Sequence, residues 1–263
     1  MLKKIQRFPY ERIICLTEET AETLYLLGEE KRIVGVTGYA VRPPQIRRDK
    51  IRVGGFTTIN IDKVISLAPD LVLSFSDLQA DIVSELIKKG LNVYCFNHRT
   101  ISGIYSMILT LGALTGSFQR ARLLVTEYKH KIAEMRLKTK NKIKPRVFFE
   151  EWDDPMISAI RWVSELIEIS GGSDIFSNIS EEQSASNRIV TRKMVIDKNP
   201  DIIIASWCGK KVNIDKIRDR EGWTNINAIL KNQIYEIKSP LILQPGPAAL
   251  TEGLRSLYEI INS

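Results

Sequence analysis

The sequence predicts an α/β fold of two doubly wound lobes with parallel sheets, joined by one long α-helix. Three observations lead to this expectation. The two halves of the chain repeat one plan, and apolar β-rich runs alternate with helical stretches in each half. Between the halves, the segment Ala121–Lys142 contains no glycine and no proline.

An internal repeat predicts the two lobes. Asn60–Ser76 and Thr191–Trp207 each combine a helical stretch, a Pro-Asp pair and an apolar run. The continuous apolar runs after Pro69 and Pro200 are typical of strands buried on both faces of a parallel sheet. Right-handed crossovers between such strands need the helices that alternate with them. Two further pairs of segments repeat in the same order: Ile13–Gly28 with Val147–Gly172, and Val93–Asn97 with Ile234–Lys238.

The segment between the repeats predicts the long helix, about 30 Å in length at 1.5 Å per residue. We therefore expect three parts in the chain. They are an N-terminal α/β lobe over residues 1–112, a connecting long helix over 113–144, and a C-terminal α/β lobe over 145–263.

The composition fits a globular chain with a real core. Of the 263 residues, 44% are hydrophobic and 26% are charged, with a formal net charge of +7. These fractions exclude a disordered or collagen-like chain. No run approaches the roughly 18 apolar residues of a membrane helix, so we expect no membrane span. Three cysteines without a CxxC pair and only two histidines argue against a disulfide scaffold and a zinc site.

The N-terminal sequence bears on the compartment. It begins with basic residues, but Gln6, Arg7 and Pro9 interrupt the apolar stretch that a secretory signal needs. The three cysteines cannot all pair within one chain, which favours a reducing compartment. We expect a cytoplasmic protein, or a periplasmic or extracellular one if a leader has been removed.

Taken in order, these segments resemble the helical-backbone class of substrate-binding proteins, in particular the vitamin B12-binding and iron-siderophore-binding proteins of ABC importers. The resemblance implies that two lobes bind a small-molecule ligand in a cleft between them and perform no chemistry. It implies cobalamin or another corrinoid or tetrapyrrole as ligand, with a ferric siderophore or haem as the alternative, and no required cofactor. The runs that carry it are RIICLTEETAETLYLLG, VGVTGY and VRPP within Val34–Pro44, VGGFTTINIDKVISLAPDLVLSF, VSELIEISGGSDIF and NPDIIIASW.

The resemblance also implies a permease that receives one acidic residue from each lobe. Asp62 matches this position in the first lobe, whereas its counterpart in the repeat is Lys193. An ammonium in place of a carboxylate would repel a permease arginine. We therefore expect the fold and the cleft to be retained without the ordinary docking on a permease.

Loops at the carboxyl ends of the strands carry the candidate ligand-binding residues, because ligands bind there in parallel α/β sheets. In TGYAVRPP, Tyr39 can stack on a ligand, and Arg42 can bind a carboxylate or phosphate; the alternative is a proline-bounded surface loop. Phe56 and Phe75 match positions at which the resemblance implies aromatic residues against a large flat macrocycle. Simple core packing is the alternative for both.

The run Glu150–Pro155, EEWDDP, places four carboxylates around one tryptophan. Trp152 can form a cleft wall, and Glu151 and Asp153 can bind polar groups or a hard cation. Alternatively, an aspartate of this run caps a helix N-terminus. Arg161 can contact the ligand, although we prefer its pairing with these acids.

The segment Ser206–Lys211, SWCGKK, ends the second Pro-Asp strand. Trp207 is a candidate for stacking on the ligand, and Lys210 for holding its anionic edge. Cys208 can be a soft ligand, a reactive thiol or an inert hydrophobe. Gln244, in the loop Ser239–Gly246, completes the candidate set.

The sequence also suggests three alternative functions. Arg136–Arg146 holds six basic residues and no acid, but we interpret it as a solvated helix end and expect no nucleic-acid partner. An enzyme would use the EEWDD carboxylates or Cys208, yet the chain has no Ser/His/Asp constellation, so we expect no enzyme and no catalytic residue. A regulatory protein whose lobe geometry responds to the ligand is the third alternative.

Overall fold

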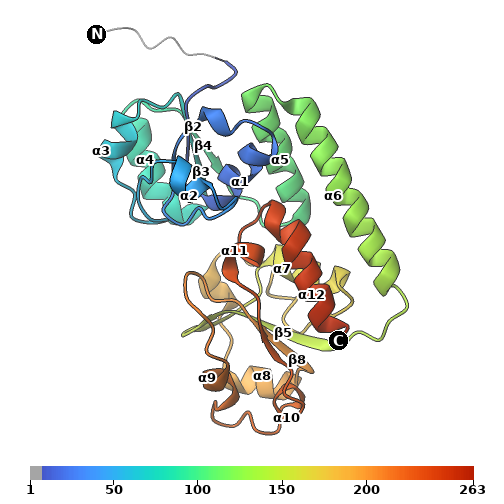
Figure 1. The fold of residues 1–263 in the computed structure, drawn as a ribbon. Helices are drawn as coiled ribbons and strands as arrows, with labels where there is room; N and C mark the ends of the chain where they lie inside the picture. Colours follow the sequence, from blue (N-terminus) through green and yellow to red (C-terminus); the bar gives the residue numbers. More distant parts are fainter. Residues whose placement is uncertain (1–7) are drawn as a thin grey trace. The chain divides into compact units, whose positions relative to one another are not determined.

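A computed structural model describes residues 8–263 and divides the chain into two compact units. Unit 1 comprises the chain up to His98 together with Ser102–Glu127, and unit 2 comprises Arg99–Ile101 and Tyr128–Ser263. Both units are α/β structures, as the ribbon in Figure 1 shows. Part of the N-terminal segment that underlies our expectation of a missing secretory signal, residues 1–7, lies outside the described residues.

Unit 1 is built on a four-stranded sheet in the order β2–β1–β3–β4, with every neighbouring pair parallel, as predicted. The predicted apolar run after Pro69 forms β3 (Leu71–Phe75), and all five of its residues are buried. The other strands are β1 (Ile13–Cys15), β2 (Ile33–Val36) and β4 (Val93–Phe96). The helices are α1 (Glu18–Leu26), α2 (Ile46–Asp49), α3 (Ile61–Ser66), α4 (Ala80–Lys88) and α5 (Ile101–Thr115).

Unit 2 holds a five-stranded sheet in the order β6–β5–β8–β9, with β7 also paired to β5. The apolar run after Pro200 forms β8 (Ile202–Ala205), buried throughout and parallel to β5 (Arg146–Asp153) and β9 (Ile234–Glu236). The remaining strands are β6 (Met156–Ser158) and β7 (Ser173–Asp174). The helices are α7 (Arg161–Ile169), α8 (Arg192–Lys198), α9 (Ile214–Arg218), α10 (Asn227–Leu230), α11 (Ser239–Ile242) and α12 (Leu254–Ile261).

One strand departs from the parallel arrangement. β6 runs antiparallel to β5, because the chain reverses at Asp154 and Pro155 and returns along the same strand. This hairpin extends β5 to Asp153 and thereby places the EEWDD run inside a strand.

The predicted long helix is α6 (Phe118–Thr139), three residues earlier at each end than Ala121–Lys142. Gly116, with a φ of +74°, separates α6 from α5. At the other end, the hydroxyl of Thr139 donates to the carbonyl oxygen of Ile169 at 3.0 Å, which ties the last turn to α7. The boundary between the two units falls within α6, between Glu127 and Tyr128.

The repeated Pro-Asp pair has a structural role that the sequence pattern did not indicate. The carboxylate of Asp70 accepts a hydrogen bond from the backbone N–H of Arg12 at 2.9 Å, just before β1. In the same way, the carboxylate of Asp201 accepts from the N–H of Arg146 at 2.9 Å, at the start of β5. Each aspartate therefore fixes the central strand of its unit against the neighbouring strand.

Candidate functional site

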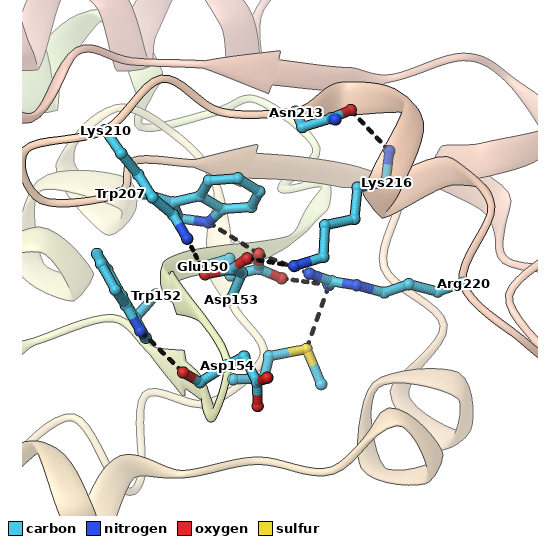
Figure 2. A network of polar contacts seen from close by, with 10 residues as sticks. Glu150, Trp152, Asp153, Asp154, Trp207, Lys210, Asn213, Lys216 and Arg220 are labelled. Carbon is cyan, nitrogen blue, oxygen red and sulfur yellow. Dashed lines mark hydrogen bonds and ion pairs between the residues drawn. The ribbon is translucent and has the colours of Figure 1, made fainter.

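The carboxyl ends of β5 and β8 bring together the acidic run, two tryptophans and three basic side chains of unit 2 (Figure 2). Glu150 and Asp153 come from β5, and Trp207 follows β8. Lys216 comes from α9, and Arg220 follows that helix. We call these residues, with Trp152 and Lys210, the strand-end network.

A buried ion pair forms the base of the strand-end network. The guanidinium of Arg220 donates to both carboxylate oxygens of Glu150, one of them at 2.9 Å. The indole N–H of Trp207 donates to the same carboxylate at 2.9 Å. The Glu150 side chain is fully buried and that of Arg220 is 7% exposed. The opposite charge and the hydrogen bonds of such a partner offset the cost of burying a charged group.

A second carboxylate holds the two lysines. Asp153 accepts from the ammonium groups of Lys210 and Lys216, each at 2.6 Å, one on each oxygen. Burial raises the pKa of Asp153, but the hydrogen bonds and charges of the two lysines outweigh burial and lower it below its usual range. The lysine side chains are 43% and 53% exposed, so their ammonium groups remain accessible above a carboxylate that is 2% exposed.

Both indole rings lie near one ammonium group. The Nζ atom of Lys210 is 4.4 Å from the centre of the Trp152 ring and 4.8 Å from that of Trp207. These distances are within the range of cation–π attraction. Trp152 is partly buried and donates its indole N–H to the carbonyl oxygen of Asp154 at 2.9 Å. Trp207 is only 3% exposed and packs in the core of unit 2, so Trp152 is the more accessible of the two rings.

Two interpretations of the acidic run are corrected by the structure. Neither aspartate caps a helix, because Asp153 ends β5 and Asp154 lies in the turn to β6. Arg161 pairs with Glu165 at 3.3 Å and with Glu181 at 2.7 Å rather than with the EEWDD acids.

Glu151 is held separately from the strand-end network. Its carboxylate pairs with Arg188 at 2.6 Å, and the Arg188 side chain is 1% exposed. The same guanidinium donates to the carbonyl oxygen of Ser158 on β6 at 2.6 Å. This pair stabilises the β5–β6 hairpin that carries Trp152.

Two further candidates of unit 2 lie in turns. Cys208 is exposed directly after Trp207, and the following Gly209 adopts a φ of +73°. Gln244 lies just after α11 and is half-buried. Their roles in binding, like those of the other candidate residues, stay predictions.

In unit 1, a buried glutamine connects three strand-end segments. The Gln79 side chain donates to the carbonyl oxygens of Phe56 at 2.7 Å and Leu16 at 3.3 Å. It accepts from the backbone N–H of Phe75 at 3.0 Å. Phe75 is 8% exposed and contacts His98 edge-on, with ring centres 5.3 Å apart, whereas Phe56 is half-buried. The predicted aromatic pair therefore lies at the carboxyl edge of this sheet, with Phe75 mostly in the core.

Tyr39 and Arg42 differ in how available their side chains are to a ligand. The Tyr39 side chain is available for contact, since the residue is 52% exposed in the loop after β2. The guanidinium of Arg42 is bound to the carboxylate of Glu22 on α1 at 2.8 Å. An anionic ligand would therefore share Arg42 with Glu22.

The first turn of α1 holds two carboxyl groups with raised pKa values. Burial, assisted by the neighbouring Glu19 and Glu22, raises the pKa of Glu18 to about 8. Burial raises the pKa of Glu19 to about 7, and its Oε1 atom has no hydrogen-bond partner in residues 8–263. Both groups lie at the carboxyl end of β1 and take up protons near neutral pH.

Lys216 and Arg220 were missed by the sequence analysis. They belong to a segment, NIDKIRDREG, that matches no binding motif. Their spacing of four residues was the available signal, since it places two cations on one face of a helical turn. Together with Asp153, Asp154 and Arg192, they line a cavity of about 540 Å³ in unit 2.

The residues considered for docking lie on matching helices of the repeat. Asp62 is exposed in the first turn of α3, and Lys193 is exposed in the first turn of α8. Lys193 forms an ion pair with Asp197 at 2.6 Å.

Comparison with known proteins decides the family. A family model described as "Periplasmic binding protein" matches residues 13–241. The chain belongs to this family.

The relatives align with nearly the whole length of this chain. A Bacillus subtilis (strain 168) protein, named as an uncharacterized ABC transporter substrate-binding lipoprotein, is 29% identical over 95% of this chain and 80% of its own. A vitamin B12-binding protein of Vibrio cholerae is 24% identical over 92% of this chain and 86% of its own. A solved structure described as a possible iron-binding (periplasmic solute-binding) protein of Staphylococcus epidermidis superposes with a TM-score of 0.81 and 26% identity, covering 97% of this chain and 100% of that one.

These comparisons bear on the expected activity. The family and the named relatives are binding proteins, so this protein is a non-catalytic binding protein, and the enzyme alternative is set aside. The Bacillus subtilis relative is named as a lipoprotein and the Staphylococcus epidermidis protein as a periplasmic one, so the cytoplasmic location that we expected from the N-terminal sequence stays a prediction. Over residues 8–263, no helix is long and apolar enough to cross a membrane. In the same residues, no cluster of three His, Cys, Asp or Glu side chains is arranged to hold a metal ion.

Proposed function

We propose that this protein is the substrate-binding component of an ABC import system and that its ligand is a flat, metal-bearing macrocycle. Cobalamin or another corrinoid is the first candidate. The vitamin B12-binding protein that aligns with 92% of this chain supports this choice. Aromatic and charged side chains at the strand ends of each unit suit a large apolar ring with polar substituents.

The observation that carries the proposal is the pair of indole rings beside Lys210. Trp152 offers a partly exposed aromatic surface at the end of β5, and the ammonium of Lys210, whose side chain is 43% exposed, lies near both this ring and that of the buried Trp207. A ring that stacks on Trp152 gains apolar contact area. The ammonium groups of Lys210 and Lys216 can then bind anionic or amide groups at the edge of that ring.

The two positions that we considered for docking on a permease do not both carry a carboxylate. Asp62 presents an acid on α3, whereas α8 presents Lys193 paired with Asp197. We therefore propose that a permease partner meets α8 through a surface of mixed charge rather than through a basic pocket.

The test is a titration of the purified protein with cobalamin, cobinamide, haem and a ferric siderophore. Binding is monitored through the change in the visible absorption of each ligand. Saturable binding of a corrinoid is expected, with about a tenfold or greater loss in Trp152→Ala, as for the removal of a stacking aromatic residue. Trp162→Phe is the matched control, because Trp162 is buried on α7 and its indole donates to the carbonyl oxygen of Ile242. Failure of all four ligands to bind would refute the macrocycle proposal.

The second candidate is a ferric siderophore or haem. The Staphylococcus epidermidis structure, described as possibly iron-binding, favours it. Binding of an iron ligand without binding of either corrinoid would select this candidate. The lysines of the strand-end network would then bind the carboxylates of such a ligand, and Lys216→Met would weaken that binding more than it weakens binding of a neutral analogue.

A further inference from the structure

The segment Arg136–Arg146, RLKTKNKIKPR, which we call the basic segment, is not explained by ligand binding. It covers the last turn of α6 and the connection to β5, and all of it belongs to unit 2 (Figure 1). It contains six basic residues and no acid. Basic residues therefore alternate with other side chains along its whole length.

Two apolar side chains of the basic segment are extended into solvent. Leu137 is 74% exposed on α6, and Ile143 is 95% exposed in the connection to β5. Ile143 stands between Lys142 and Lys144 in the chain. Such exposure of a branched apolar side chain leaves nearly its whole surface in contact with water, which is unfavourable unless a partner covers it.

The structure holds Ile143 outward by fixing its neighbours. The ammonium of Lys142 donates to the side-chain oxygen of Asn262 at 2.7 Å and lies 5.2 Å from the centre of the Tyr258 ring. The ammonium of Lys144 pairs with Glu168 at 3.0 Å. With both flanking lysines bound to the body of unit 2, the side chain between them points away from it. The contacts of the two lysines restrict the backbone around this residue before a partner arrives, which lowers the ordering cost of binding.

The charge of the basic segment is only partly neutralised. Lys144 and Arg146 pair with Glu168 and Asp201. Within residues 8–263, Arg136, Lys138 and Lys140 form no ion pair, and all three are exposed. The segment thus combines uncompensated cations with two projecting apolar groups.

We propose that the basic segment is a docking surface for an anionic lipid bilayer. The lysines and arginines bind the headgroups, while Ile143 and Leu137 insert at the boundary with the acyl chains. A nucleic acid is less well matched, because the segment contains no aromatic side chain on which a base could stack.

The position of the basic segment leaves the candidate ligand site open. It precedes β5, whereas Glu150, Trp152 and Asp153 lie at the other end of the same strand. The strand from Arg146 to Asp153 spans about 23 Å at roughly 3.3 Å per residue. A bilayer at the first end therefore does not cover the strand-end network, and the two binding events proceed independently.

The experiment is co-sedimentation of the full chain with two kinds of vesicle, phosphatidylcholine alone and phosphatidylcholine mixed with phosphatidylglycerol. Binding is expected to the mixed vesicles and to fall with added salt, since charge attraction drives the approach. Leu137→Ser/Ile143→Ser is expected to weaken it about tenfold, through the loss of apolar burial. Lys138→Glu/Lys140→Glu removes two cations and adds two anions. Its affinity for the mixed vesicles should fall by about fivefold for each charge changed.

Two control variants isolate the surface. Leu123→Ser alters a side chain that is 72% exposed on the same helix but outside the basic segment. Lys88→Glu/Lys89→Glu changes the net charge as much as the lysine variant does, at two exposed positions around the end of α4. Both controls should bind mixed vesicles within about twofold of the parent chain. Far-ultraviolet circular dichroism would verify the fold of each variant.

Several results would overturn the proposal. They are equal binding to both kinds of vesicle, equal losses in the two charge variants, full binding by Leu137→Ser/Ile143→Ser, or binding of RNA without binding of vesicles. Because the ligand titration uses no lipid, failure here leaves the proposed ligand unaffected, and failure of that titration leaves this docking surface unaffected.

Discussion

Replacing Arg220 with methionine would leave the carboxylate of Glu150 buried without its cation. Glu150 is fully buried, and Arg220 donates to both of its oxygens from a site that is 7% exposed. Methionine retains much of the apolar contact of the arginine stem but donates no hydrogen bond. The indole N–H of Trp207 would remain as the one donor to Glu150 among those that we describe.

The burial of the Glu150–Arg220 pair determines how much unfolding free energy Arg220→Met should lose. Removing one member of a buried ion pair destabilises a protein by about 3–5 kcal/mol, because the remaining charge loses compensation. The double variant Glu150→Gln/Arg220→Met removes both charges and keeps an acceptor for Trp207, so it should cost about 1–2 kcal/mol. The double variant is thus predicted to be more stable than the single variant.

The assay can be confined to unit 2. All four tryptophans of the chain, Trp152, Trp162, Trp207 and Trp223, belong to this unit. Urea unfolding followed by tryptophan fluorescence therefore reports the unit that contains the change, and the midpoint shift gives the difference in unfolding free energy.

Arg218→Met is the matched control. Arg218 is 40% exposed and pairs with Asp215 at 2.6 Å, three residues away on α9. A surface pair of this kind contributes about 0–1 kcal/mol. If Arg220→Met costs no more than Arg218→Met, or if the double variant is no more stable than Arg220→Met, the buried pair does not stabilise unit 2 as we infer.

Three further outcomes are expected. Since burial raises the pKa of Glu19 to about 7 and that of Glu18 to about 8, their charged forms oppose folding, and stability should fall as the pH rises from 4.5 to above 7. Glu19→Gln should reduce this fall by about 3 kcal/mol in thermal melts at several pH values, and the part caused by Glu18 should remain. Burial raises the pKa of Asp201, but the hydrogen bonds and charge of Arg146 outweigh burial and lower this pKa to about 2. About 1 kcal/mol of stability that is present above pH 4 should therefore be lost toward pH 2 in the parent chain, and this loss should be absent in Asp201→Asn. Asn60→Ala should lower the free energy of unfolding by about 1 kcal/mol in urea unfolding followed by circular dichroism, since the Asn60 side chain caps α3 by accepting from the backbone N–H of Lys63 at 2.9 Å. In each of the three experiments, an unchanged unfolding midpoint would contradict the physical reason given for it.

The fold was predictable because its signals are local. The apolar runs of β3 and β8 and the uninterrupted helical stretch of α6 each occupy one continuous segment, and the repeat supplied their order. The antiparallel strand β6 was not anticipated, although the Asp154–Pro155 pair is a common turn signal. For this run we considered ligand binding by the acids and, as the alternative, a helix N-terminus capped by Asp153 or Asp154, but not a hairpin.

The candidate site was predictable only in part, because its contacts join distant segments. Trp152, Trp207 and Lys210 could be selected from residue type and position after a strand. That Asp153 would bind Lys216, 63 residues later in the chain, could not be inferred from one sequence. The burial of Trp207 likewise depends on packing against side chains from distant segments of unit 2, which local periodicity does not report.

The sharing of Asp153 between two lysines has a consequence for the evolution of this surface. If either Lys210 or Lys216 is replaced, the carboxylate retains the other ammonium, and the buried Glu150–Arg220 pair beneath is unaffected. Each exposed lysine can therefore vary on its own at little cost to the fold. Mutational paths to new ligand preferences therefore remain open at these positions, whereas changes in the buried Glu150–Arg220 layer cost stability.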